Sequence, residues 1–245
     1  MTKKDLKSLK KAGHALSLIL KKLKKFIKPG VTGLDINNFA EEFLKNNFPG
    51  YNLSSKGYGG FPASVCVSFN ENIIHGIPSK KEVKNGDIVK VDIVVDFKGW
   101  HADSAYTYIV GGVSKQDKKL VKTTKKALDQ AIKIARAGNT IGDIGYIVQN
   151  VIESQGFSVM RKYCGHGIGR SMHEAPSIPN FGTPGEGVKL EEGMIIAIEP
   201  MAFIGDYEVE VAANGWDVCA KDKSQTAHFE HTLVVRKGKP IVITK

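Results

Sequence analysis

Two histidines stand seven positions apart in a glycine-rich stretch of the chain. His166 and His173 lie in CGHGIGRSMHEAP, residues 164–176, with three glycines and one glutamate. Glycine-rich loops often bind phosphate, but those patterns place a Lys after the glycines or open a helix. Here no Lys follows within the stretch, and Pro176 opposes a helix. We therefore expect the glycines to let the backbone pass close to a bound group, with both imidazoles pointing at it.

Two aspartates lie on a predicted β-hairpin at residues 88–112. Alternating apolar residues predict one apolar strand face, with Asp92 on the opposite face. A two-residue turn at 98–99 would pair residue 92 with residue 105 and place Asp103 diagonally beside Asp92. Neighbouring carboxylates repel unless one is protonated or a cation lies between them. A longer turn would change this register, and the pair could instead lie on the solvent-exposed face of the sheet.

Two glutamates occur in otherwise apolar strand patterns of the second half. Glu199 ends the strand in MIIAIEPM and is followed by Pro200, and Glu230 lies in a second apolar strand, AHFEHTLVV. A buried glutamate rarely stays charged without a partner. Either residue by itself could be a turn residue or one that protects a strand edge.

The acids and one histidine together form a possible metal site, made of Asp92, Asp103, His166, Glu199 and Glu230. Four carboxylates and an imidazole suit Mn, Fe(II), Co or Zn and do not resemble a thiolate zinc site. Bridging carboxylates allow two ions about 3.5–4 Å apart, an arrangement that activates water for hydrolysis. From the residues alone, His166 and His173 are equally well explained as ordinary loop histidines.

The elements that must position these residues show an internal repeat. Each copy of the repeat comes after a Lys-rich helical pattern, at 4–28 for the first copy and at 115–136 for the second. Each copy is itself an amphipathic helix in its pattern, and strands follow it. Thr32 and Thr140 fit helix caps. The matched residues, at an offset of 108, are Gly30, Thr32, Asp35 and Ile36 with Gly138, Thr140, Asp143 and Ile144. The repeat predicts two α+β halves with helices behind a central sheet and a ligand pocket between them.

Positive charge is concentrated at the start of the chain. Residues 1–28 contain ten lysines and Asp5 alone as an acid, so this segment carries +9 of the total +10. Apolar residues recur at helical spacing within it, which predicts a helix with one packed face. The lysines are then a solvated outer face, a surface for an anionic partner such as RNA, or a membrane contact.

Composition narrows the class of protein. The 245 residues, 42% of them hydrophobic, allow one large domain or two fused halves. We find no apolar run near the roughly 20 residues that span a bilayer, and no secretory signal. The three cysteines, Cys66, Cys164 and Cys219, form no C-x-x-C pair, which favours a reducing, cytoplasmic location.

The sequence resembles the type one methionine aminopeptidases, which have the pita-bread metallopeptidase fold. The motifs SFNENIIHGIP, the two hairpin aspartates, YCGHGIGRSMHEAP, IAIEPM and FEHT occur in that family's order and spacing. The resemblance extends over essentially the whole chain. It implies one α+β catalytic domain, residues 1–245, with pseudo-symmetric halves of roughly 1–112 and 113–245. A curved, mainly antiparallel central sheet would hold the metal site between them.

The resemblance also implies roles for single residues. The implied ligands of two divalent ions (Co, Mn, Fe(II) or Zn) are Asp92, Asp103, His166, Glu199 and Glu230. Glu199, His75 and His173 are implied to be catalytic, and the two histidines contact substrate without binding metal. His173 would donate to the substrate carbonyl as the tetrahedral intermediate forms. The remaining histidines, expected to be ordinary helix, strand or turn residues, are His14, His101, His228 and His231.

A methionine pocket is implied at a further set of positions. The implied wall residues are Tyr58, Phe61, Cys66, Met172 and Trp216. Ser55 and Gly59 stand where many relatives have Cys and His, and Met172 where an aromatic residue is frequent. These departures affect the expected width of the pocket and leave the expected reaction unchanged. Ordinary core packing is the alternative for each wall residue.

The implied reaction is removal of the initiator methionine from nascent chains when the second residue is small. One alternative is an X-Pro aminopeptidase or dipeptidase of the same fold, which usually has an additional N-terminal domain. Another is a peptide- or RNA-binding relative that has lost its metal ligands. We expect a cytoplasmic monomer that acts on nascent polypeptide N-termini, with ribosomal RNA contact through helix 1–28 and without a DNA or membrane partner.

Overall fold

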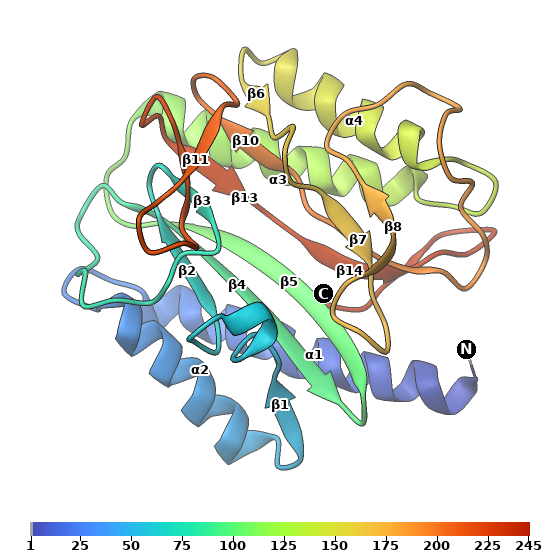
Figure 1. Cartoon of the computed structure of the whole chain (residues 1–245), viewed down its shortest axis with the longest axis horizontal. Helices are drawn as coiled ribbons and strands as arrows, with labels where there is room; N and C mark the ends of the chain where they lie inside the picture. Colours follow the sequence, from blue (N-terminus) through green and yellow to red (C-terminus); the bar gives the residue numbers. More distant parts are fainter. Residues whose placement is uncertain (1) are drawn as a thin grey trace.

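The computed structural model describes residues 2–245. In this range the chain forms the helices α1 (Lys3–Phe26), α2 (Gly33–Asn47), α3 (Lys115–Ile134) and α4 (Ile141–Glu153), and the short 3₁₀ helix η1 (Tyr58–Gly60). The strands of the first half are β1 (Tyr51–Leu53), β2 (Cys66–Phe69), β3 (Asn72–Ile74), β4 (Ile88–Phe97) and β5 (Trp100–Ile109). Those of the second half are β6 (Ser158–Val159), β7 (Gly165–Gly167), β8 (Glu174–Ile178), β9 (Ile195–Ile198), β10 (Met201–Phe203), β11 (Val209–Val211), β12 (Val218–Ala220), β13 (Thr226–His228), β14 (His231–Val234) and β15 (Ile241–Val242). Figure 1 shows α1 and α2 on one side of the strands and α3 and α4 on the other.

The helices α2 and α4 begin in the same way, as the repeat predicts. Thr32 and Thr140 are N-caps whose hydroxyls accept from the backbone N–H of Asp35 and Asp143. Each aspartate in turn accepts from the threonine backbone N–H, which completes a capping box. Hydrogen bonds from Thr32 lower the pKa of Asp35, and those from Thr140 lower the pKa of Asp143. The predicted caps are confirmed.

The basic first helix packs along one face, as its apolar spacing predicts. Leu9, Leu16, Ile19 and Leu23 of α1 are fully buried against the apolar face of β4 and β5. The helix ends at Phe26, where Ile27 turns to an extended conformation just before Lys28-Pro29. A residue that precedes proline disfavours helical geometry, so the helix stops here.

The hairpin of β4 and β5 has the predicted register. Lys98 and Gly99 form the turn at positive φ (56° and 71°), and Asp92 pairs with Ala105. Two residues of positive φ match the twist of a two-residue hairpin. The face that carries Asp92 is covered: Val94 on it is 4% exposed. The alternative of a solvent-exposed hairpin face is therefore wrong.

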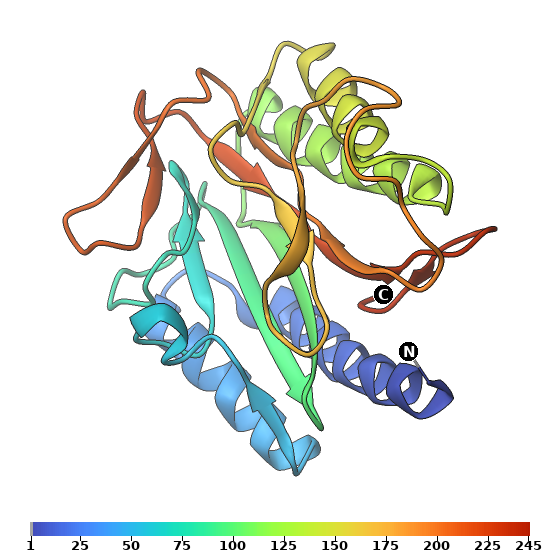
Figure 2. The same ribbon diagram turned by 45° about the vertical axis from the view of Figure 1, so that its right-hand side comes forward.

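The strands form several antiparallel sheets that meet at the centre. Their orders are β1-β4-β2 with β5 beside β4, β13-β10-β6, β11-β12-β3 and β15-β14-β9-β7-β8. The strand-to-strand ladders of backbone hydrogen bonds occur within each sheet. Other hydrogen bonds join β5 to the segment between β13 and β14. Ser104 Oγ donates to Glu230 O at 2.6 Å, and Glu230 N donates to Ala105 O at 3.0 Å. Figure 2 shows the loop that carries β11 and β12 projecting beside this centre.

The apolar core follows the two halves. One cluster lies beneath α1 and α2 and a second beneath α3 and α4, with a smaller group around β3, β10 and β12. The architecture is the α+β arrangement that the repeat predicts. Within residues 2–245, no helix is long and apolar enough to cross a membrane.

Candidate metal centre and substrate pocket

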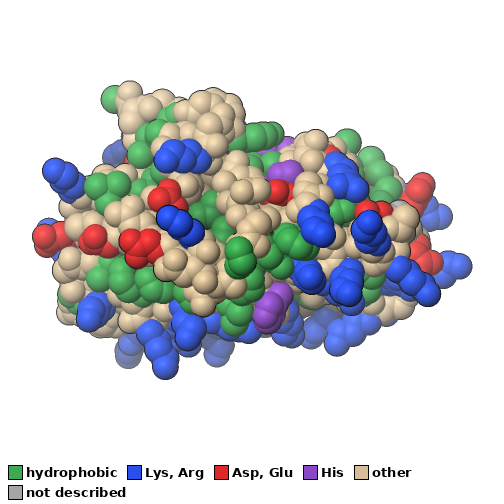
Figure 3. All heavy atoms as spheres, turned by 90° about the horizontal axis from the view of Figure 1, so that it is seen from below, with side chains coloured by type: hydrophobic (Ala, Val, Ile, Leu, Met, Phe, Trp, Pro, Cys, Tyr) green, Lys and Arg blue, Asp and Glu red, His purple; other side chains and the backbone are tan. Residues whose placement is uncertain are grey.

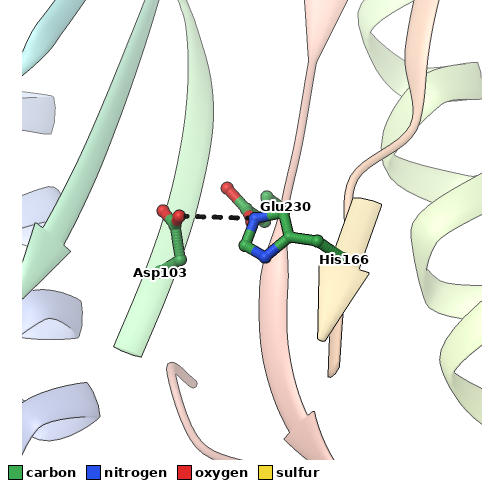
Figure 4. Close-up of side chains that lie close together, drawn as sticks. All are labelled: Asp103, His166 and Glu230. Atoms are coloured by element: carbon green, nitrogen blue, oxygen red, sulfur yellow. Dashed lines mark ion pairs between the residues drawn. The ribbon is translucent and has the colours of Figure 1, made fainter. Parts of the chain in front are cut away.

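Three side chains from distant parts of the chain converge between the two halves. Asp103, His166 and Glu230 each offer one metal-ligating atom, and these atoms lie within 4.8 Å of one another. Figure 4 shows them pointing toward a common point from β5, β7 and the segment after β13. The first half supplies Asp103 and the second half supplies the other two. The site therefore exists only when both halves are packed together.

His166 is oriented by its own backbone. Its Nδ1 lies 2.9 Å from Gly167 O, which fixes the proton on Nδ1. The Nε2 atom is then free and faces Asp103 Oδ2 and Glu199 Oε1, each at 3.8 Å. A free imidazole nitrogen beside two carboxylates can bind a divalent metal ion.

The glycines beside His166 have a different purpose from the one predicted. A Cβ at Gly165 would lie 2.3 Å from Ala197 O, and one at Gly167 would lie 2.1 Å from Ala175 O. These neighbours are the backbone of β9 and β8, so the glycines permit close strand packing. The prediction that they approach a bound group is wrong, because adjacent strands occupy that space.

Glu230 lies between two strands rather than within one. β13 ends at His228 and β14 begins at His231, so Phe229 and Glu230 form the break. The chain changes partners here, since β13 pairs with β10 and β14 pairs with β9. The prediction of one continuous strand is wrong. The Glu230 backbone is nevertheless held in place by its hydrogen bonds with Ser104 and Ala105 of β5.

Asp92 and Glu199 complete the group of buried acids. Glu199 follows β9 directly, as predicted, and Asp92 lies on β4 next to Asp103. Burial raises the pKa of Glu199 to about 8 and raises that of Asp92. For Asp103 and Glu230, burial and the neighbouring carboxylates raise the pKa well above the ordinary value. Without a cation, these carboxylates would therefore resist ionisation.

Several carboxylate oxygens lack a hydrogen-bond donor. Asp92 Oδ1, Asp103 Oδ1 and Glu230 Oε1 are buried and have no hydrogen-bond partner within residues 2–245. Unpaired buried polar atoms are unfavourable and rare in folded proteins. Metal coordination would satisfy these oxygens and neutralise their charge. The donor set therefore fits divalent metal ions.

His228 lies beside the acid cluster, a proximity that the sequence did not predict. It lies on β13, a strand as expected, and is 1% exposed. Its Nε2 atom is 3.3 Å from Glu199 Oε2, and burial lowers its pKa to about 4. The buried neutral ring therefore lies beside Glu199, although neither ring nitrogen has a hydrogen-bond partner within residues 2–245. Its position two residues before Glu230 was the only local signal of this proximity.

A pocket of about 310 Å³ opens beside Asp92 and Asp103. Its remaining lining residues are Ser55, Tyr58, Gly59, Phe61, Cys66, His75, Val94, Met172, His173 and Trp216. The ring of Phe61 meets that of Trp216 edge to face, 5.1 Å between centroids. All five residues expected in the pocket wall lie here, together with both expected non-ligand histidines.

The two pocket histidines are held differently. His173 Nδ1 lies 2.8 Å from the Tyr58 hydroxyl, and its ring stands 4.3 Å from that of His166, nearly perpendicular to it. When the hydroxyl donates to Nδ1, the neutral ring carries its proton on Nε2. His75 has a left-handed φ of 58° and packs edge to face on Tyr163. Burial lowers the pKa of His75 to about 4 and lowers that of His173.

Comparison with known proteins assigns the chain to a protein family. A family model described as metallopeptidase family M24 matches residues 7–237. A methionine aminopeptidase of Mycoplasma capricolum is 44% identical over 242 residues, which cover 98% of this chain and 96% of that one. Methionine aminopeptidase 1 of Bacillus subtilis is 40% identical over 244 residues, 100% of this chain and 98% of that one.

Solved structures agree with the sequence comparison. The methionine aminopeptidase of Thermotoga maritima superposes with a TM-score of 0.97 at 43% identity and covers 100% of this chain and 98% of that one. The prolidase of Pyrococcus horikoshii shares the fold at 21% identity, with a TM-score of 0.77. This chain covers only 62% of that prolidase.

Proposed function

The chain belongs to metallopeptidase family M24, and from this premise we propose that the protein is a methionine aminopeptidase. It hydrolyses the first peptide bond of nascent proteins and releases the initiator methionine. The observation that carries this function is the mainly apolar pocket, whose lining includes Asp92 and Asp103 of the acid cluster. An X-Pro peptidase is disfavoured, because methionine aminopeptidases are 40% and 44% identical to this chain, whereas the prolidase is 21% identical and shares only the fold.

The protein uses divalent metal, and the ligands we propose for two ions are Asp92, Asp103, His166, Glu199 and Glu230. When bound, such ions would supply Lewis-acid chemistry at the substrate carbonyl and a water activated for hydrolysis. The unpaired oxygens of Asp92, Asp103 and Glu230 support this assignment. Co, Mn, Fe(II) and Zn all suit these donors. Among the ligands, Glu199 is also proposed to be catalytic, and His228 Nε2 lies 3.3 Å from one of its oxygens.

The pocket histidines act on the substrate itself. His173 donates from Nε2 to the substrate carbonyl oxygen, whose negative charge grows in the transition state. Tyr58 holds the other ring nitrogen, so the donor is already oriented before substrate binds. His75, held in place by Tyr163, is proposed to contact the same substrate from another wall of the pocket.

The pocket wall selects the first residue. Phe61, Trp216 and Tyr58 present aromatic surface to a flexible thioether, and sulfur–aromatic contacts favour methionine. Met172 and Cys66 add apolar surface. We propose that the space beyond the scissile bond is small, so that only a small second residue fits.

The test is release of methionine from Met-Ala-Ser compared with Met-Leu-Ser and Ala-Ala-Ser, with each candidate metal added in turn. We expect metal-dependent cleavage of Met-Ala-Ser and little cleavage of the other two. Comparable rates for Met-Ala-Ser and Met-Leu-Ser would contradict the proposed second-residue specificity. Cleavage of X-Pro dipeptides in place of Met-Ala-Ser would support the alternative peptidase.

Nascent chains are presented at the ribosome, and we propose that the basic first helix contacts ribosomal RNA. The exposed lysines at the start of α1 are Lys3, Lys4, Lys7, Lys10 and Lys11. Figure 3 shows Lys and Arg side chains gathered along one side of the molecule. A groove of about 810 Å³ also lies between α1 and α3, with Lys24 on one wall and Lys122 and Lys126 on the other. Such a surface attracts phosphate and releases counterions on binding.

Replacing the five α1 lysines with Gln tests this contact. Tripeptide cleavage should be unchanged, because the pocket lies elsewhere. Co-sedimentation with ribosomes should weaken, and its salt dependence should become less steep. Unchanged ribosome binding over rising KCl would mean that the lysines are only a solvated helix face. The proposed location is the cytoplasm, which suits three cysteines that form no disulfide within residues 2–245.

A further inference from the structure

Lys90 is among the largest fully buried side chains of the protein. It lies on β4, is 1% exposed, and stands two residues before Asp92 on the same strand face. Lysine is almost never fully buried unless it has a specific partner. The pocket walls described above do not include Lys90, so it does not contact the substrate.

The partner of Lys90 is one backbone carbonyl. Its Nζ donates to Asn70 O at 2.6 Å. The same oxygen accepts from Thr226 Oγ1 at 2.7 Å and from Thr226 N at 3.2 Å. A single carbonyl thus receives donors from β4 and from the first residue of β13.

Asn70 is itself fixed in the turn between β2 and β3. Its backbone has a left-handed φ of 52°. Its side-chain amide donates to Asp87 Oδ1 at 2.9 Å, and its Oδ1 accepts from Ile88 N at 2.9 Å. The carbonyl therefore has little freedom and is a firm anchor for both donors.

Each of the three joined segments leads directly to a residue of the proposed site. The turn at Asn70 continues through β3 to His75, and Thr226 begins the strand that leads to Glu230. Lys90 lies in the strand that carries Asp92. The relative placement of these three site residues depends on how the segments meet at Asn70 O.

We propose that Lys90 is a positioning residue, which sets the spacing of Asp92, His75 and Glu230 through the Asn70 carbonyl. This inference rests on the proposed function. Burial lowers the pKa of Lys90 well below its ordinary value, but the donation needs only an N–H, which the amine has in either protonation state. Displacements of about 1 Å can lower the rate of an enzyme by roughly 100-fold.

The test compares Lys90→Met with Lys90→Gln, two side chains of similar length of which only Gln has an N–H donor. For Met-Ala-Ser, Lys90→Met should lower kcat by roughly tenfold to 100-fold and change KM little. The KM is spared because Phe61 and Trp216 are not held by Asn70. Lys90→Gln should recover part of kcat.

Val91→Ala is the matched control for stability. Val91 is the next residue, fully buried in the apolar core on the other face of β4. It should lower Tm at least as much as Lys90→Met while kcat stays near that of the wild type. Equal kcat for Lys90→Met and Lys90→Gln, or a loss that follows Tm in all three variants, would overturn the proposal.

Thr226→Val tests the same carbonyl should Lys90→Met fail to fold. It keeps the shape of the side chain and removes the Oγ1 donor. We expect kcat to fall, and the effect of Thr226→Val in the Lys90→Gln background should differ from its effect alone, as for coupled residues. If Thr226→Val left kcat unchanged, and had the same effect in the wild type and in the Lys90→Gln background, the role of Asn70 O would be overturned. Inactive wild-type protein would instead contradict the proposed function itself.

Discussion

At the scale of single residues, the site is a set of buried acids without sufficient donors. Burial and neighbouring carboxylates, Asp92 first for Asp103 and Asp103 first for Glu230, raise both pKa values, and each residue keeps an oxygen without a hydrogen bond within residues 2–245. The packing of two halves forces like charges together, which is unfavourable unless a cation joins them. The electrostatics of the site therefore favour metal binding.

Asp92→Asn should remove at least one metal ion and most of the turnover. Asn keeps the shape of Asp92 but has no negative charge to bind a cation. Residues that only support metal ligands already contribute about 10–100-fold, so we expect the loss of a ligand to lower turnover at least as much. Metal content by elemental analysis and Met-Ala-Ser cleavage measure both effects. Asp96→Asn is the control, since Asp96 lies on the same strand and bonds to Asn52.

His173→Ala should lower kcat by roughly 10²–10³-fold with normal metal content. The reason is that its Nε2 donor acts on charge that develops only in the transition state. Loss of bound metal in this variant would mean that His173 is a ligand. His101→Ala, on β5 and outside the pocket, should retain activity.

His228→Leu should weaken metal binding by up to about 10–100-fold, because Glu199 loses the polar ring that lies beside its second oxygen. His228→Gln should weaken it less, since an amide keeps a polar group beside Glu199. Titration with a metal-sensitive dye measures both affinities. Equal affinity in the wild type and His228→Leu would show that Glu199 needs no such support.

At the scale of elements, the two repeated helices depend on their caps. Thr140 supplies the oxygen that accepts from the first turn of α4, and Asp143 returns the bond. Thr140→Ala should lower the free energy of unfolding by about 1 kcal/mol, measured by urea denaturation, with kcat unchanged. Thr140→Ser retains the hydroxyl and should lose much less. A similar loss in both variants would mean that the methyl group, rather than the cap, stabilises α4.

At the scale of the whole molecule, we propose that residues 1–245 unfold as one unit. Besides the bonds at Glu230, Thr107 Oγ1 of β5 donates to His228 O and accepts from His228 N. Neither half can keep these contacts when the other unfolds. The folding of the halves and the formation of the site should therefore be a single event.

The two tryptophans allow this to be measured. Trp100 is buried in the first half beneath α1, and Trp216 packs on Phe61 in the pocket wall. In Trp100→Phe and Trp216→Phe variants, the remaining tryptophan should report the same urea midpoint, and far-UV circular dichroism should agree. Two separate midpoints would show that the halves unfold independently.

The sequence by itself determined what depends on neighbours along the chain. The caps at Thr32 and Thr140, the turn at Lys98-Gly99 and the placement of Asp92 beside Asp103 were all predictable. Each follows from backbone preferences and side-chain periodicity within a few residues. The resemblance of the motifs extended this to the family, the fold and the pocket residues.

Only the tertiary structure decided which strand faces which. Asp103, His166 and Glu230 are more than 60 residues apart in sequence, and they meet because β5 of one half packs on β13 and β14 of the other, and β9 pairs with both β14 and β7. Local periodicity specifies the face of a strand on which a side chain lies, but not what that face meets. For this reason the contact of His228 with Glu199 and the complete burial of Lys90 had no sufficient signal in the sequence.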